Sequence, residues 1–155
     1  GVSNLDKYKT MSDNIAKAVS KFKLDDDIIT HRYVTNVDYI TGNGSTAEQM
    51  KEAVGKFYTD KGFFSTCLFE GQTKVFGGSS PIHIETLIRK GTNGAYINKY
   101  SEKKDLEFEF LLNRGTKFQI VDAGERIVKE GKFNSKTCQW ELVDVVERYL
   151  ILEVI

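Results

Sequence analysis

The run Glu107-Phe108-Glu109-Phe110-Leu111-Leu112 alternates charged and apolar residues, which is the pattern of a half-buried β-strand. Residues two apart share one face of a strand, so Glu107 and Glu109 project together, with Cα atoms roughly 6.6–7 Å apart. The apolar residues that alternate with them enter the core. Two carboxylates this close repel each other, and such pairs occur on solvated faces or where a cationic ligand or a developing positive charge compensates them. The run therefore predicts a strand that is either a solvent-facing sheet edge or part of a site.

Further short runs of β-branched and aromatic residues, separated by glycine-bearing turns, lie on both sides of this strand. They cover residues 28–34, 63–69, 82–89, 117–121, 126–129 and 140–155. With the first run they make about seven strands, and the long last run is compatible with one bent strand or two. Because most strands follow helices without regular βαβ alternation, the pattern predicts an α+β domain with a mainly antiparallel sheet or two packed sheets.

Two helical segments are expected before most of the strands. Apolar residues recur every three or four positions from Leu5 to Phe22, which predicts an amphipathic helix, or two short ones, ending before the acidic turn at 25–27. The stretch Ser45-Thr46-Ala47-Glu48 predicts a capping box at the start of another helix, in which the serine and glutamate side chains satisfy backbone N–H groups. Positions 50, 54, 57 and 58 form its expected apolar face, and Lys61-Gly62 ends it.

Length and composition restrict the classes of protein to consider. The 155 residues suit a single domain, and 40% hydrophobic residues provide enough material for a packed core. The formal net charge is +0, which argues against a nucleic-acid partner bound through bulk charge. No apolar run reaches the ~20 residues that cross a bilayer, so no membrane partner is expected for this domain. The first residues do not form a signal peptide, and we expect the chain to be a fragment of a larger protein.

Several common site motifs are missing. Cys67 and Cys138 have no further cysteine or histidine at metal-ligand spacing, so no zinc site is expected, and two free thiols are favoured over a disulfide. The loop Gly42-Asn43-Gly44-Ser45 lacks the ending of a P-loop and the third glycine of a dinucleotide fingerprint, which indicates a helix-entry loop. Neither His31 nor His83 has a serine or cysteine triad around it, which disfavours a hydrolase.

Three other stretches carry groups that could serve a site. Arg32 stands within an otherwise apolar strand, where a guanidinium reaches solvent, pairs with a carboxylate, or binds a ligand's phosphate or carboxylate. The hydroxyls of Phe64-Ser65-Thr66-Cys67-Leu68 are suited to holding a carboxylate from a neighbouring strand, although polar strand residues are often simply exposed. The loop at 74–80 combines glycines with Phe76, as in a loop that closes over a ligand or in a plain hairpin connection.

The order of these features resembles the mono-ADP-ribosyltransferase toxins, in particular the enzyme components of the actin-modifying binary toxins and their insecticidal relatives. The likeness covers roughly residues 16–121 and the final strands. Its most specific part is Lys90-Gly91-Thr92-Asn93-Gly94-Ala95-Tyr96-Ile97, followed by Tyr100-Ser101 and by residues 107–116. The resemblance implies an ADP-ribosyltransferase fold, in which N-terminal helices accompany a mainly antiparallel two-sheet β-core, over the single domain 1–155.

The resemblance also implies roles for individual residues. Arg32 matches the arginine that binds an NAD phosphate, and the backbone at Tyr33 is placed to hold the nicotinamide amide. Ser65 matches the serine that orients the catalytic glutamate, and Thr66 braces the same strand. Phe76 falls where the family places an aromatic residue that packs on the nicotinamide.

The Glu-x-Glu pair takes the chemical roles in this resemblance. Glu109 matches the catalytic glutamate, and Glu107 matches the upstream glutamate of arginine-modifying members. Residues 100–107 would form the turn that recognises the target protein. The resemblance implies transfer of ADP-ribose from NAD, a substrate, to an arginine side chain, without a metal.

The chain departs from the family pattern at three positions. Cys67 replaces the last residue of the usual Ser-Thr-Ser, His31 stands where an aromatic residue is common, and Ser79 stands where an arginine often follows the loop aromatic. The N-terminal helices are also short. We expect these departures to reduce NAD affinity without abolishing activity.

The sequence is therefore interpreted as the catalytic domain of a bacterial or phage toxin or effector. It would be secreted or delivered into a host cell as part of a larger protein, with a delivery component and with actin or another host protein as partners. An NAD glycohydrolase and a catalytically silent binding domain of the same fold remain alternatives.

Overall fold

The computed structural model describes residues 4–70, 80–100 and 106–155, and for residues 98–100, 106 and 107 it describes the backbone alone. Within these ranges the helices are α1 (Asn4–Val19), α2 (Asp38–Thr41) and α3 (Ala47–Glu52). The strands are β1 (Ile28–Val34), β2 (Phe57–Thr59), β3 (Phe64–Cys67), β4 (Ile82–Ile88), β5 (Gly94–Tyr100), β6 (Leu106–Leu112), β7 (Lys117–Asn134) and β8 (Gln139–Val154).

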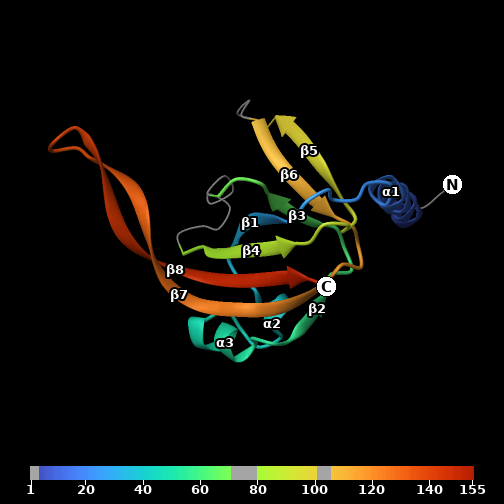
Figure 1. Cartoon of the computed structure of the whole chain (residues 1–155), viewed down its shortest axis with the longest axis horizontal. Helices are drawn as coiled ribbons and strands as arrows, with labels where there is room; N and C mark the ends of the chain where they lie inside the picture. Colours follow the sequence, from blue (N-terminus) through green and yellow to red (C-terminus); the bar gives the residue numbers. More distant parts are fainter. Residues whose placement is uncertain (1–3, 71–79, 101–105) are drawn as a thin grey trace.

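The strands are hydrogen-bonded in the order β2-β7-β8-β4-β1-β3-β6-β5 (Figure 1). Every neighbouring pair is antiparallel except β4 and β8, which run parallel. This confirms the α+β class and the mainly antiparallel pairing. One residue pair, His31 with Cys67, joins β1 to β3. This single pair joins the two expected sheets, β2-β7-β8-β4-β1 and β3-β6-β5, into one eight-stranded sheet.

The hydrophobic core fills the space between the strands and the short helices. Phe64, Phe110 and Phe118 are completely buried, and their strands come from both halves of the sheet, β2-β7-β8-β4-β1 and β3-β6-β5. Ile40 of α2 and Met50 of α3 belong to the same cluster, and α3 packs against β7 (Figure 1). Burying side chains of this size stabilises the fold by about 1.5–3 kcal/mol each. The core thus holds the two halves of the sheet together, although only one residue pair joins them through the backbone.

The second predicted helix is shorter than expected. It ends at Glu52, and Phe57 and Tyr58, which the helical spacing placed on its buried face, instead form β2 and pair with β7. Pairing with β7 satisfies backbone groups that a longer helix would have satisfied internally. The capping box is present but shifted by one residue, since Thr46 accepts from the Gln49 backbone N–H and Gln49 accepts from Thr46.

Strand β5 was not expected from the sequence. It begins at Gly94, where an added Cβ would stand 2.4 Å from the Phe110 ring. Gly94 therefore allows β5 to lie close to the core side of β6, and Tyr96 then packs edge-on against Phe110 at 5.1 Å between ring centroids. A close approach of this kind explains a glycine at the start of this strand.

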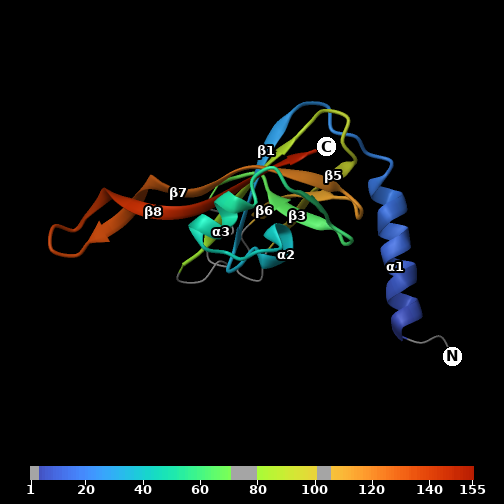
Figure 2. The ribbon, with the colours of Figure 1, turned by 90° about the horizontal axis from the view of Figure 1, so that it is seen from below.

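Two elements project from the sheet. Residues 117–121 and 126–129, expected as separate strands, belong to the continuous β7, which forms a long hairpin with β8 (Figure 1). Helix α1 stands away from the sheet, and its apolar stripe is exposed rather than buried, with Leu5 77% and Tyr8 68% accessible (Figure 2). Neither α1 nor any other helix in the described ranges combines the length and the apolar character needed to cross a membrane.

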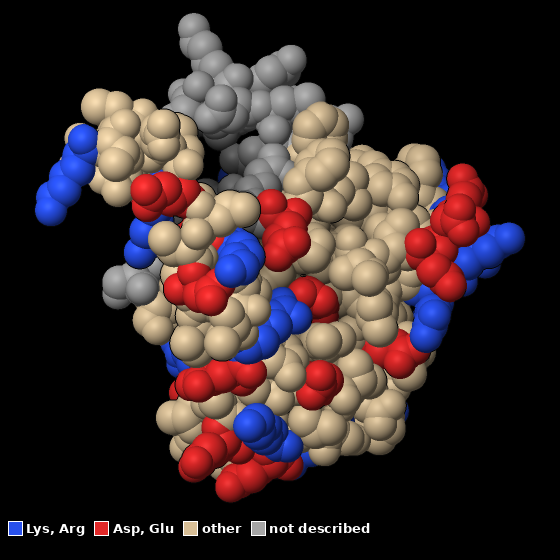
Figure 3. All heavy atoms as spheres, turned by 60° about the vertical axis from the view of Figure 1, so that its left-hand side comes forward, with Lys and Arg blue, Asp and Glu red and all other residues tan. Residues whose placement is uncertain are grey.

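Charged groups of both signs are interspersed over the face that carries the hairpin end (Figure 3). Among the described residues, most of the charged side chains that form ion pairs are exposed. An example is Lys129, whose Nζ lies 2.5 Å from Asp144 Oδ1. The two cysteines are free, with Cys67 buried and Cys138 exposed, as the sequence favoured.

Candidate active site

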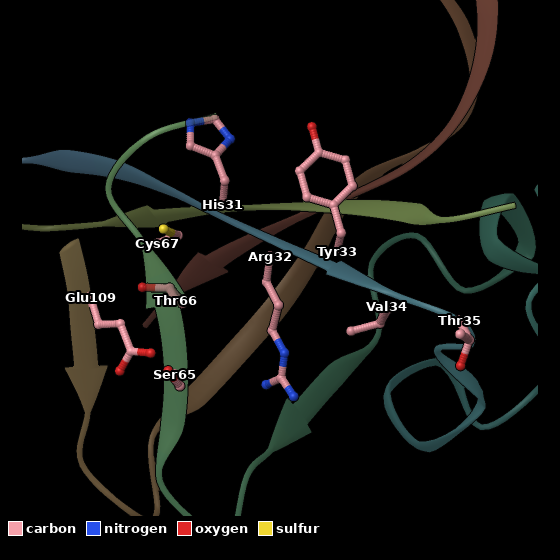
Figure 4. A pocket seen from close by; sticks show the side chains of 9 residues that line it. All are labelled: His31, Arg32, Tyr33, Val34, Thr35, Ser65, Thr66, Cys67 and Glu109. Atoms are coloured by element: carbon pink, nitrogen blue, oxygen red, sulfur yellow. The ribbon is translucent and has the colours of Figure 1, made fainter. Parts of the chain in front are cut away.

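A cavity of ≈ 360 Å³ opens where β1 and β3 diverge after their single pair (Figure 4). Its lining comes from β1, β3 and β6 and from the residue after β1. The lining residues are His31, Arg32, Tyr33, Val34, Thr35, Ser65, Thr66, Cys67 and Glu109. A volume of this size lies within the ~300–1,000 Å³ of ordinary ligand pockets.

Arg32 is the cationic group of this cavity. The alternation of side chains along β1 turns Arg32 away from His31 and Tyr33, as Figure 4 shows. Its guanidinium carbon lies 5.3 Å from the centroid of the Phe64 ring, a cation–π contact that fixes the side chain without neutralising its charge. Arg32 forms no ion pair with any residue in the described ranges. The charge is therefore available to an anionic ligand.

Strand β3 separates Arg32 from the carboxylate of Glu109. Thr66 is buried, and its hydroxyl donates to the Phe110 carbonyl oxygen at 2.9 Å, which ties β3 to β6. The Cys67 thiol donates to the Phe108 carbonyl oxygen at 3.3 Å. These bonds hold the register that places Cys67 opposite Glu109. The Cys67 thiol therefore links β3 to β6 through this hydrogen bond.

Glu109 extends from β6 toward β3 (Figure 4). Cys67 pairs with Glu109, and Ser65 lies two residues from Cys67 on β3, so Ser65 shares the face of the sheet that carries Glu109. Ser65 is half-buried and contributes its hydroxyl to the cavity wall. The cavity therefore has a guanidinium on one side of β3 and a carboxylate and a hydroxyl on the other. Such a site can hold a ligand with a negative group at one end and a positive or partly positive centre at the other.

Tyr33 presents its backbone, rather than its ring, to the side of β1 that carries Arg32. The ring is buried and stacks on His83, with centroids 4.4 Å apart. Burial raises the pKa of its hydroxyl, with further contributions from the charges of Glu147 and Glu70. On the same face, burial and the neighbouring His83 lower the pKa of His31.

Five of the residues singled out in the sequence come together in this cavity: Arg32, Tyr33, Ser65, Thr66 and Glu109. Phe76 lies outside the described residues, as does most of the expected recognition turn. Glu107 is described by its backbone alone, which pairs with Lys99 of β5. The roles expected of Phe76 and Glu107 thus stay predictions.

Sequence reasoning did not include Val34 and Thr35 in the site. They follow Tyr33 directly, so the end of β1 was the available signal. It was hidden because neither residue type carries a reactive group. Both provide wall surface next to the guanidinium.

Comparison with known proteins identifies the family to which this fold belongs. Residues 2–147 match the family described as ADP-ribosyltransferase exoenzyme. The NAD(+)--arginine ADP-ribosyltransferase EFV of Enterococcus faecalis is 38% identical over 114 residues, which are 70% of this chain and 21% of that protein. This chain thus spans about a fifth of the length of that curated relative.

Solved structures share the fold at lower identity. The C3larvin toxin of Paenibacillus larvae superposes with a TM-score of 0.65 at 19% identity, over 100% of this chain and 80% of that one. The BECa toxin of C. perfringens superposes with a TM-score of 0.65 at 23% identity, over 100% of this chain and 36% of that one. The architecture around the cavity is therefore that of ADP-ribosylating toxins. Together with the match over residues 2–147, this shows that the chain belongs to the ADP-ribosyltransferase exoenzyme family.

Proposed function

We propose that this chain is a mono-ADP-ribosyltransferase domain that transfers ADP-ribose from NAD to an arginine side chain of a target protein. The observation that carries the proposal is the placement of Arg32 and Glu109 on opposite sides of β3 in one cavity. NAD has a matching polarity, because its diphosphate is anionic and its nicotinamide–ribose bond acquires positive charge as it breaks. We propose arginine as the acceptor residue because the relative from E. faecalis is an NAD(+)--arginine ADP-ribosyltransferase.

Arg32 binds a phosphate of NAD in this proposal. Its guanidinium has no competing ion pair in the described part of the chain, and the Phe64 ring holds it in place. A charge-assisted bond to phosphate contributes about 1.5–3 kcal/mol. The backbone at Tyr33 holds the nicotinamide amide, and Phe76 packs on the nicotinamide ring.

Glu109 faces the anomeric carbon of the ribose. As the bond from this carbon to nicotinamide breaks, nicotinamide leaves with the electron pair and the sugar becomes an oxocarbenium ion. A fixed carboxylate stabilises this cation, and by analogy with one oxyanion-hole group the effect is ~3–4 kcal/mol. Ser65 orients the carboxylate.

Glu107 holds the guanidinium of the target arginine. A nitrogen of this group forms a new bond to the anomeric carbon and loses a proton, which Glu107 accepts. Because Glu107 acts on the nucleophile, its loss should stop transfer to protein while nicotinamide release continues with water as the acceptor. The target is proposed to be a host protein, with actin the first to test, reached after secretion or delivery as part of a larger protein.

The test incubates the chain with NAD labelled in its adenosine part, with and without host-cell lysate, and measures protein labelling and nicotinamide release. The proposal expects labelled protein whose label neutral hydroxylamine removes, as for an arginine N-glycoside. Glu107→Ala should lose the labelling and keep the release, whereas Glu125→Ala, an exposed position on β7, should keep both. Release without labelling in the parent chain would favour a glycohydrolase, and absence of both would favour a silent binding domain.

A further inference from the structure

The two histidines of the chain lie side by side although they are 52 residues apart in sequence. His31 Nδ1 is 2.9 Å from His83 Nε2, and one ligand atom each from His31, His83 and Glu85 lies within 4.8 Å of the others. His31 and Arg32 point to opposite faces of β1 (Figure 4), so the cluster lies on the other face of β1 from Arg32, although His31 also lines the cavity.

Regular sheet pairing places the three side chains. His83 and Glu85 are two residues apart on β4 and therefore share a face. The β1–β4 register sets His31 directly opposite Glu85 and sets Tyr33 opposite His83. All three donors thus stand on two hydrogen-bonded strands, which restricts their positions more firmly than a loop would.

The outer hydrogen bonds orient His83 as a ligand. Its Nδ1 is 3.0 Å from Glu147 Oε1, and Glu147 also accepts from Arg126 Nε at 2.8 Å. An ionised carboxylate can only accept, so in the tautomer that donates from Nδ1 to Glu147 the Nε2 lone pair faces His31 Nδ1, 2.9 Å away. Arg126 Nη2 also lies 3.2 Å from His83 Nδ1. A carboxylate behind a histidine in this way is the usual outer shell of a metal-bound imidazole.

The charges around the cluster favour a cation. Arg126 is shared between Glu85 and Glu147, so one positive charge faces two carboxylates. A third carboxylate, Glu70, acts electrostatically on His31, and Arg126 acts on it in the opposite sense. Glu85 can keep its bond to Arg126 through one oxygen and offer the other to a metal, as metal-ligating carboxylates commonly do.

We propose that His31, His83 and Glu85 bind a zinc-class divalent cation. Tetrahedral bonds of about 2.0–2.1 Å place ligand atoms about 3.3 Å apart, so the two nitrogens need to separate by a few tenths of an ångström and Glu85 needs to turn inward. His31 also lines the cavity, which gives water access for a fourth ligand. The bound cation joins β1 to β4 one residue from Arg32 and stiffens the strand that carries it. Spacing along the sequence predicted no zinc site, because these ligands converge from two strands.

The test uses the Cys138→Ser variant as the parent, so that the exposed thiol does not bind metal, and removes metal first with EDTA. Zn²⁺ is then titrated against a chromophoric chelator, and Co²⁺ is added separately to record its visible spectrum. We expect one equivalent of Zn²⁺, a rise in Tm on adding it, and absorption bands of four- or five-coordinate Co²⁺. Failure of the parent to bind a stoichiometric metal ion would overturn the proposal.

Variants identify the ligands. His31→Gln and Glu85→Gln should each lower Zn²⁺ affinity by more than ~100-fold, and Glu147→Gln by ~10–100-fold, as for an outer-shell carboxylate. Glu125→Gln removes the same charge from an exposed position of β7 and should bind as the parent does. Circular dichroism establishes that each variant is folded. Unchanged binding by both His31→Gln and Glu85→Gln would contradict the site, and Zn²⁺ binding does not depend on whether NAD is the substrate.

Discussion

Arg32 and Arg126 are both partly buried arginines of one sheet, yet their surroundings differ. Arg126 pairs with Glu85 and Glu147, and its guanidinium carbon lies 4.6 Å from the centroid of the Tyr149 ring. Arg32 has a similar aromatic contact, with Phe64, but no ion pair within the described residues. Burying a charge without a partner is unfavourable, so an arginine kept in this state indicates a ligand that supplies the missing anion. The difference separates an arginine that stabilises the fold from one that serves binding.

The largest expected effect concerns the carboxylate that faces Arg32 across β3. Glu109→Gln keeps the shape and removes the charge, so transfer and nicotinamide release should both fall by at least ~100-fold, following the ~3–4 kcal/mol assigned to this charge. Initial rates with labelled NAD measure the effect. Glu141→Gln, on the exposed hairpin, should leave both rates unchanged, and persistent release by Glu109→Gln would remove Glu109 from the catalytic role.

The next largest effect concerns Arg126, whose loss should lower the stability of the folded chain. Arg126→Ala leaves Glu85 and Glu147 without their shared cation, which should lower the free energy of unfolding by about 2–3 kcal/mol, somewhat below the range for fully buried pairs. For a chain of this size Tm should fall by roughly 5–10 °C, as calorimetry would measure. Arg32→Ala should change Tm little in the absence of NAD. An equal loss of stability in both variants would contradict the distinction between the two arginines.

A smaller effect should follow from loosening β3, which lies between the two sides of the cavity. Thr66→Val keeps the shape but removes the hydroxyl that donates to the Phe110 carbonyl oxygen at 2.9 Å. The loss should be about 1 kcal/mol, or ~2–4 °C in Tm. Thr59→Val, at an exposed position of β2, serves as the control. A Tm equal to that of the parent chain would show that this bond does not hold β3 to β6.

Local patterns predicted the strands that form the cavity because each alternates regularly. Glu109 and Phe110 occupy opposite faces of β6 as the alternation required, and Arg32 stands in β1 as expected. The convergence of Arg32, Ser65 and Glu109 followed from family resemblance rather than from periodicity. Periodicity assigns faces, whereas contacts between distant strands depend on the order of strands in the sheet.

The features that were missed depend on tertiary pairing. Phe57 and Tyr58 had helical spacing, but β7 offered them a pairing edge and they form β2. The stripe on α1 has the period of a buried helix, yet Tyr8 and its neighbours are exposed, because period alone does not provide a packing partner. His31 and His83 carried no motif, since the β1–β4 register alone brings them together.

The central claim, that Arg32 is kept unpaired to bind NAD, is tested most directly by the NAD-induced rise in Tm of the parent chain, Arg32→Ala and Arg126→Ala. A ligand that binds the folded state raises Tm by mass action. Removing a phosphate contact of about 1.5–3 kcal/mol should weaken binding enough that NAD scarcely shifts the Tm of Arg32→Ala. Arg126→Ala should start from a lower Tm and show the same rise as the parent chain. An equal rise in Arg32→Ala and the parent chain would contradict the claim and would make Arg32 a structural residue.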